Sequence, residues 1–277
     1  MTSSDQLPEL LALEPGGDGR WSGVTPSGHD RPNLFGGIVA AQALRAGHLS
    51  AGLDRQPHSL HAYFLRSGRF GEPLLFRVDE TRSGRSFSAR RVEVSQQGGP
   101  ILTMIVSFKV PESGDDYQVD PSGLGPPTEG AATTGTGTET GTPGDGPFEL
   151  VDAPPGERHP GSLDWSAVRY WARARQALPD DPGIHACAIV AMGDLRTAGP
   201  PLAARADERP VRMTSLDYAL WFHRPTRADG WLLFDLRPGG NGGARGLTHG
   251  VVHDAGGVQA ASLAMELMLR VRSSPAN

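Results

Sequence analysis

The two halves of the chain repeat one another. Four short landmarks recur in the same order, each 156 to 160 residues from its copy: Ser59-Leu60 with Ser215-Leu216, Leu74-Leu75-Phe76 with Leu232-Leu233-Phe234, Gly84-Arg85 with Ala244-Arg245, and Gly98-Gly99 with Gly256-Gly257. A near-constant offset through several ordered landmarks predicts an internal duplication. We therefore expect the chain to build one structural unit twice.

Each half combines one helix with antiparallel strands. The small apolar residues 34–47 predict a helix with Asn33 as N-cap and Gly47 just after its end. A second helix is predicted over 181–195, where Pro182 suits the first helical position. Strand patterns account for much of the rest: 58–66, 74–81, 87–94, 101–108, 165–176, 211–223, 231–236, 246–253 and 258–269. This order indicates an α+β fold.

The two halves are separated by a segment of low complexity. Residues 111–147 are rich in Pro, Gly, Thr and acidic side chains, and the piece 131–142 has too few apolar residues to bury a core. We therefore expect it to be mobile. The predicted organisation is an N-terminal unit over 1–110, a linker over 111–147 and a C-terminal unit over 148–277.

Charge and cysteine content exclude several classes of protein. The net charge is −5 and there is no basic run, which argues against a nucleic-acid or anionic-membrane surface. No apolar stretch approaches the roughly 18 residues that span a bilayer. The one cysteine, Cys187, suits a reducing compartment, and the first residues lack the features of a signal peptide. These features predict a cytoplasmic protein.

Five co-linear motifs resemble type II (TesB-type) acyl-CoA thioesterases: 35–44, 58–66 and 84–92 in the first half, and 215–225 and 243–246 in the second. The resemblance implies a double-hotdog fold, in which two tandem helix-plus-antiparallel-sheet repeats form one pseudo-dimeric unit. It further implies hydrolysis of a fatty acyl-CoA without a covalent acyl-enzyme. The implied partners are the acyl-CoA substrate and further copies of the chain, with no cofactor and no metal.

The resemblance places the family's catalytic carboxylate at Asp194 and the site in the C-terminal unit. Asp194 lies near the carboxyl end of the predicted helix, where the macrodipole disfavours negative charge by a few tenths to about 1 kcal/mol. We therefore expect a raised proton affinity, which suits a general base. The alternative is a solvated acid in the loop that follows the helix.

The family hydroxyl, which lies two residues before an Asp, falls on Ser215. Because side chains alternate along a strand, Ser215 and Asp217 should share one face and Thr214 should lie on the other. Ser215 is then the expected ligand of the attacking water, unless it is an ordinary strand serine. Asp217 is either a second polar group of the site or a structural hydrogen-bond acceptor.

The third family position departs from the pattern. A Gln that precedes the Glu of the last strand is replaced by Met265. A thioether accepts hydrogen bonds only weakly and donates none. Loss of one preorganised donor costs about 2.7–4 kcal/mol in other enzymes. We therefore expect weak hydrolysis, and a faster enzyme when Met265 is replaced by Gln.

Substrate contacts are expected at Gly36 and Gly37, whose backbone N–H groups suit the thioester oxygen, and at Arg245, which suits the CoA phosphates. For the glycines close packing is an alternative, and for Arg245 pairing with a carboxylate. The spacing of the histidines predicts no metal site.

Two other functions compete. A non-catalytic protein that binds acyl thioesters fits Met265 in the site. Residues 27–33 faintly resemble an element of enoyl-CoA hydratases, but position 35 is Phe where that chemistry needs His.

Overall fold

The computed structural model describes residues 6–25, 33–118, 123, 125–128, 135–136, 146–154, 167–206 and 209–271. Within these residues the first half contains two helices and six strands: α1 (Leu7–Leu10), β1 (Glu14–Gly17), β2 (Arg20–Gly23), α2 (Gly36–Ala51), β3 (Gln56–Phe64), β4 (Leu74–Ser83), β5 (Phe87–Gln96) and β6 (Gly99–Lys109). The second half repeats the plan: β7 (Gly135–Thr136), β8 (Phe148–Asp152), β9 (Val168–Ala174), α3 (Pro182–Gly193), α4 (Gly199–Ala203), β10 (Val211–Ser215), β11 (Asp217–Phe222), β12 (Leu232–Gly242), β13 (Arg245–Asp254) and β14 (Gln259–Val271).

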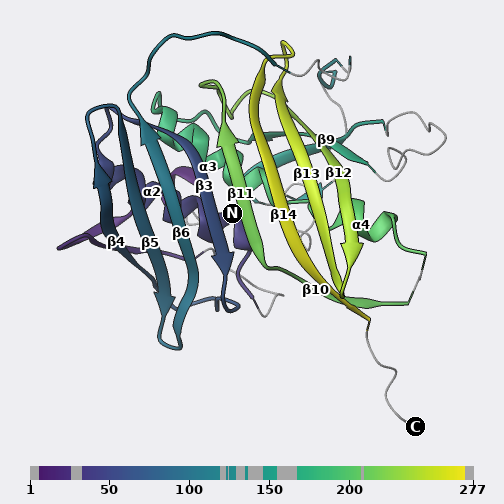
Figure 1. Cartoon of the computed structure of the whole chain (residues 1–277), viewed down its shortest axis with the longest axis horizontal. Helices are drawn as coiled ribbons and strands as arrows, with labels where there is room; N and C mark the ends of the chain where they lie inside the picture. Colours follow the sequence, from purple (N-terminus) through teal and green to yellow (C-terminus); the bar gives the residue numbers. More distant parts are fainter. Residues whose placement is uncertain are drawn as a thin grey trace.

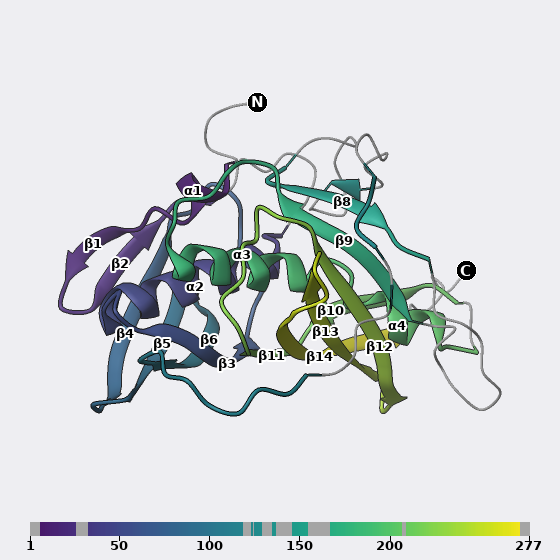
Figure 2. The ribbon, with the colours of Figure 1, turned by 90° about the horizontal axis from the view of Figure 1, so that it is seen from above.

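One continuous antiparallel sheet runs through both halves (Figure 1). Its order is β1-β2-β4-β5-β6-β3-β11-β14-β13-β12-β9-β8-β7, with β10 paired to β14. The halves meet where β3 pairs with β11, and the register there places the buried Leu60 opposite the buried Leu220. The sheet curves around α2 and α3, which lie side by side on its concave face (Figure 2). This is the predicted double hotdog, an α+β fold.

The two central helices pack closely because each presents small residues to the other. A Cβ added to Gly37 of α2 would lie 2.8 Å from the Ala191 carbonyl oxygen of α3. A Cβ added to Gly47 would lie 2.9 Å from Cγ1 of Val106 in the sheet. Gly47 is therefore an interior contact residue of α2, and its prediction as the residue that follows the helix was wrong. The helix ends instead at Ala51, and its C-cap residue is Gly52, which has φ 100°.

The predicted place of Pro182 in the first turn of α3 is confirmed, whereas the predicted N-cap of α2 is wrong. Asp181 caps α3, because its carboxylate accepts a hydrogen bond from the Gly183 backbone N–H at 2.8 Å. For α2 the N-cap is Phe35 and not Asn33, and among the described residues no side chain caps that end. The start of α2 was therefore predicted two residues too early, and its first-turn N–H groups are left for other acceptors.

Two strand predictions also need correction. The predicted strand 211–223 is interrupted at Leu216, which separates β10 from β11. The predicted strand 231–236 is too short, because β12 continues through most of the glycine-rich stretch 239–243 to Gly242. The turn consists of Gly243 and Ala244, with φ of 56° and 58°, as a two-residue hairpin of the primed type requires.

The segment between the halves is only partly described. Residues 111–118 cross from the end of β6 towards the turn between β13 and β14, where Gln118 donates to the Gly257 carbonyl at 2.9 Å. Most of the stretch expected to be mobile, 131–142, lies outside the described residues; within it Gly135–Thr136 pairs with β8. Among the helices of the described chain, none has the length and apolar character needed to cross a membrane.

Candidate functional site

A cavity of about 670 Å³ lies where the two halves meet. It is bounded by the start of α2, the residues that follow α3, the end of β3 and strand β10. Gly36, Asp194 and Ser215, which the sequence predicted for the site, all line it. Residues from both halves therefore form one pocket, with the predicted catalytic residues in the C-terminal unit and Gly36 in the N-terminal unit.

Asp194 is the C-cap residue of α3 and is only 8% exposed. Its carboxylate faces the start of α2, since a Cβ added to Gly36 would lie 3.1 Å from its Oδ2 atom. The C-terminal end of α3 disfavours the negative charge, whereas the N-terminal end of α2 favours it. The sequence revealed only the first of these two opposing fields. The alternative that Asp194 is a solvated acid in the loop after the helix is wrong, because the residue is buried.

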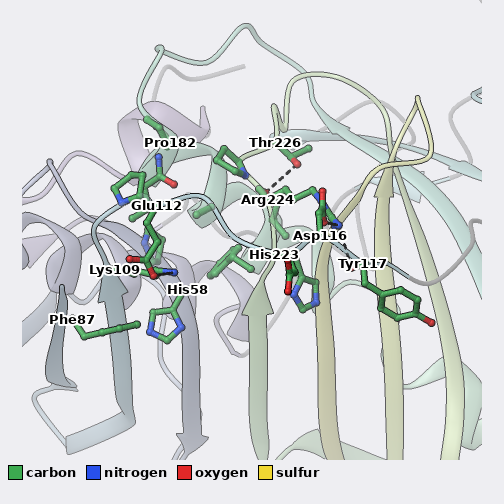
Figure 3. A pocket seen from close by; sticks show the side chains of 18 residues that line it. His58, Phe87, Lys109, Glu112, Asp116, Tyr117, Pro182, His223, Arg224 and Thr226 are labelled. Carbon is green, nitrogen blue, oxygen red and sulfur yellow. Dashed lines mark hydrogen bonds and ion pairs between the residues drawn. The ribbon is translucent and has the colours of Figure 1, made fainter.

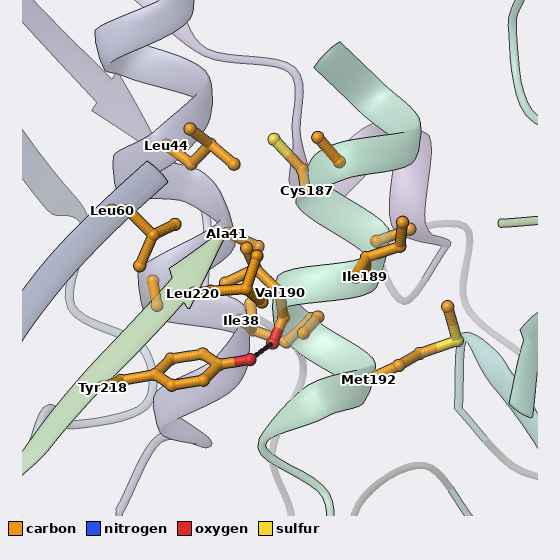
Figure 4. Packing of buried hydrophobic residues seen from close by; sticks show 14 of the residues in the cluster. Ile38, Ala41, Leu44, Leu60, Cys187, Ile189, Val190, Met192, Tyr218 and Leu220 are labelled. Carbon is orange, nitrogen blue, oxygen red and sulfur yellow. Dashed lines mark hydrogen bonds between the residues drawn. The ribbon is translucent and has the colours of Figure 1, made fainter. Parts of the chain in front are cut away.

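Two buried tyrosines hold the end of α3 in place. Tyr218 donates its hydroxyl to the Val190 carbonyl at 3.1 Å (Figure 4), and Tyr170 donates to the Met192 carbonyl at 2.8 Å. Burial raises the pKa of both hydroxyls, with the charge of Asp194 as a secondary cause for Tyr218. Both remain protonated donors, so they satisfy carbonyls that a helix end otherwise leaves unpaired. Asp194 thus extends from a fixed point.

Strand β10 brings hydroxyls to the opposite wall. Ser215 lines the cavity, and so does Thr214. The strand is interrupted at Leu216, so the predicted alternation does not carry over from Ser215 to Asp217. Asp217 is a structural acceptor, since its carboxylate accepts a hydrogen bond from the Glu266 backbone N–H at 2.9 Å.

Met265 lies behind the cavity wall and is fully buried. Its sulfur accepts a hydrogen bond at 3.0 Å from the hydroxyl of Thr197, a cavity-lining residue that the sequence interpretation missed. The only available signal was the position of Thr197 three residues after Asp194. Thr197 is 2% exposed.

The remaining predicted contacts have structural partners. Gly37 lies where α2 approaches α3 closely, which agrees with the alternative that this glycine serves helix packing. Arg245 pairs with Glu266 through Nε to Oε1 at 2.8 Å, which is the carboxylate alternative. Two other arginines, Arg66 and Arg212, do line the cavity. Among the described residues no group of three or more His, Cys, Asp and Glu side chains is arranged to hold a metal ion.

A second cavity of about 650 Å³ lies beside the start of α3 and the end of β11 (Figure 3). It is the counterpart of the first through the duplication, because the start of α3 and the end of β11 replace the start of α2 and the end of β3. The segment 110–118 runs over it, with Glu112 paired to Lys109 at 2.6 Å and Asp116 paired to Arg224. The two basic side chains of this cavity, Lys109 and Arg224, are therefore already paired with carboxylates of the same chain.

The two cavities differ at the position of the carboxylate. Asp194 faces Gly36 at the start of α2, whereas His48 faces Gly183 at the start of α3, so closely that a Cβ on Gly183 would collide with its Nδ1 atom. His48 Nε2 is 2.8 Å from the Arg55 carbonyl oxygen, and burial lowers the pKa of its imidazole. His48 thus takes the place at the start of α3 that Asp194 takes at the start of α2, but unlike Asp194 it is not among the residues that line the adjacent cavity.

The chain matches two sequence models of one family. The model described as the acyl-CoA thioesterase N-terminal domain matches residues 25–109, and the model of the C-terminal domain matches residues 127–269. Acyl-coenzyme A thioesterase 8 of Homo sapiens is 32% identical over 266 residues, which cover 86% of this chain and 81% of that protein.

Solved structures agree with this. The acyl-CoA thioesterase II TesB2 from Mycobacterium marinum is 34% identical with a TM-score of 0.81, over 98% of this chain and 99% of that chain. A tesB protein from Mycobacterium avium subs paratuberculosis is 28% identical with a TM-score of 0.78, over 95% of this chain and 98% of that chain. Since both domain models together span most of the chain, the protein belongs to the type II acyl-CoA thioesterase family of thioester hydrolases.

Proposed function

We propose that the cavity beside Asp194 binds the thioester of an acyl-CoA and that Asp194 activates the water that hydrolyses it. The water oxygen attacks the carbonyl carbon while one of its protons passes to the Asp194 carboxylate. The tetrahedral intermediate then collapses, the C–S bond breaks, and the CoA sulfur leaves with the proton that Asp194 returns. The products are a free carboxylic acid and CoA.

The observation that carries this proposal is that Asp194 and Ser215 line the same cavity. Ser215 is proposed to accept the second proton of the water as a hydrogen bond and so to orient it. The uncapped first turn of α2, which begins at Gly36, offers backbone N–H groups to the thioester oxygen as negative charge develops on it. A thioester is electrophilic enough for a positioned base and a polarised carbonyl to suffice.

The test is release of free thiol from a panel of acyl-CoAs of increasing chain length. Thiol release that saturates with substrate supports the hydrolase. Tight binding of the same acyl-CoAs without thiol release supports the non-catalytic alternative. Hydration of crotonyl-CoA would identify a hydratase; of the residues that suggested that chemistry, only Asn33 lies in the described part of the chain.

Replacement of Met265 by Gln is expected to raise the turnover number. Gln has nearly the length of Met, and its amide would lie beside Thr197, next to the cavity wall, with both a donor and an acceptor. We expect a gain of about tenfold or more, because one recovered donor is worth about 10²–10³ in rate where it is fully preorganised. Steady-state kinetics with one acyl-CoA measure it. An unchanged turnover number would mean that position 265 takes no part in organising the site.

We also propose a cytoplasmic homo-oligomer that associates through the outer face of the sheet. Tyr63 and Ile105 on that face are 58% and 54% exposed, and Trp221 of the neighbouring β11 is 39% exposed. Large apolar side chains gathered on one exposed face favour protein association. Light scattering on the eluting peak of a size-exclusion column is expected to give a multiple of 29.3 kDa. A mass of one chain at micromolar concentration would contradict the oligomer.

A further inference from the structure

Thr197 is the second buried polar side chain of the cavity wall. Among the described residues that line the cavity, Asp194 is 8% exposed and Thr197 is 2% exposed, while Ser215 is more open to solvent. Thr197 follows the end of α3 by one turn of chain, on the same side as Asp194. Two residues of one short segment, one with a carboxylate and one with a hydroxyl, thus line the same cavity.

Thr197 is held to the sheet at two points. Its backbone carbonyl accepts a hydrogen bond from the Thr248 hydroxyl at 2.6 Å, and its own hydroxyl donates to the Met265 sulfur at 3.0 Å. Thr248 of β13 and Met265 of β14 are opposite one another in the sheet register. One pair of opposite residues in the sheet therefore fixes both the backbone and the side chain of Thr197, so its hydroxyl is preorganised.

The proton of this hydroxyl is only weakly engaged. A thioether is a weak acceptor, and the other acceptor within reach, the Asp194 carbonyl oxygen, is 3.4 Å away. Turning the Thr197 O–H towards a better acceptor in the cavity therefore gives up only weak hydrogen bonds. Had the residue at 265 been a strong acceptor, the same proton would have been held more firmly.

We infer that Thr197 is a catalytic residue that donates its hydroxyl proton to the attacking water. The inference rests on the proposed function. A water that gives one proton to Asp194 and a hydrogen bond to Ser215 has two lone pairs left. If Thr197 donates to one of them, only the other remains, and it points at the thioester carbon. Three contacts thus fix the orientation of the nucleophile. Thr197 supplies the donor that Met265 lacks, but its O–H must first leave the Met265 sulfur, so an amide at position 265 can still raise the rate.

Replacement of Thr197 by Val removes the donor and keeps the β-branched shape. We expect the turnover number to fall roughly 10- to 100-fold with little change in KM, because a misoriented nucleophile costs about this much. Thr197→Ser retains the hydroxyl and is expected to stay within about fivefold of the parent. In the Thr197→Val background, Met265→Gln is expected to recover most of the lost rate, since the amide restores a donor beside the same space.

Thr226→Val is the matched control. The Thr226 hydroxyl also donates to a backbone carbonyl, that of Arg224 at 3.2 Å, but it lies beside the second cavity. The parent rate is expected for this variant, and thermal melting of every variant separates lost chemistry from lost folding.

A Thr197→Val enzyme with the parent turnover number overturns the inference, provided that Asp194→Asn is inactive. An active Asp194→Asn enzyme overturns the proposed function instead. If Thr197→Val and Thr197→Ser lose rate equally and both melt lower, Thr197 is a structural residue and the inference fails.

Discussion

The Asp194→Asn enzyme is expected to lose about 10²–10⁴ of the parent turnover number, because that is what a positioned general base contributes. Asn has the shape of Asp but no basic oxygen at neutral pH. The carboxylate is 8% exposed and extends from a helix end that two tyrosines hold. The change should therefore remove the base without moving its neighbours. Steady-state thiol release with one acyl-CoA at saturating concentration measures the loss.

Asp217→Asn is the matched control, because Asp217 accepts a hydrogen bond from the Glu266 N–H and an amide oxygen can still accept it. We expect this variant to hold within a few-fold of the parent rate. Melting temperatures of both variants should match the parent. Asp194→Asn turning over as fast as Asp217→Asn would remove Asp194 from the mechanism.

Ser215→Ala is expected to lower the turnover number by roughly 10- to 100-fold, because the water keeps its base but loses one of the groups that orient it. The decisive observation comes from the double variant. If Asp194 and Ser215 act on one water molecule, then Asp194→Asn combined with Ser215→Ala should be no slower than Asp194→Asn alone, within about threefold.

The four enzymes of this cycle should be compared with the same acyl-CoA at saturation. Losses that multiply in the double variant would mean that the two residues act on separate steps or at separate places. Thr214→Val belongs in the same experiment, because Thr214 lines the cavity beside Ser215. A larger loss for Thr214→Val than for Ser215→Ala would transfer the proposed role to Thr214.

The scaffold was predictable because the duplication is visible as repeated landmarks at a near-constant offset. Two copies of a helix and an antiparallel sheet can bury their apolar faces on one another, which the observed pairing of β3 with β11 achieves. The start of α3 was also predictable, because Pro182 suits the first turn of a helix. Such features depend on neighbours in the sequence or on the repeat itself.

Features that depend on distant partners could not be predicted. Glycine is common just after the end of a helix, but Gly47 lies inside α2, where it packs closely against Val106 of the sheet. The sequence indicated the C-terminal end of α3 at Asp194, but not the start of α2 that approaches the same carboxylate from the other half. Alternation along 211–223 failed for a similar reason, since the interruption at Leu216 arises where β10 and β11 pair separately with β14.

Thr197 illustrates the same limit inside the site. The substitution at Met265 was evident in the sequence, whereas the hydroxyl beside its sulfur became visible only when the segment after α3 packed against β13 and β14. A single sequence reveals a missing donor more readily than the neighbour that could replace it. The role proposed for Thr197 therefore depends on packing and not on motif.

A crystal structure with a non-hydrolysable thioether analogue of an acyl-CoA tests the account most directly. We predict that the carbon equivalent to the thioester carbonyl lies in the cavity beside Gly36, with one water in hydrogen-bonding contact with both Asp194 and Ser215 and directed at that carbon. The account is contradicted if the reactive end of the analogue occupies the second cavity beside His58 and Arg224, or if no single water reaches both side chains.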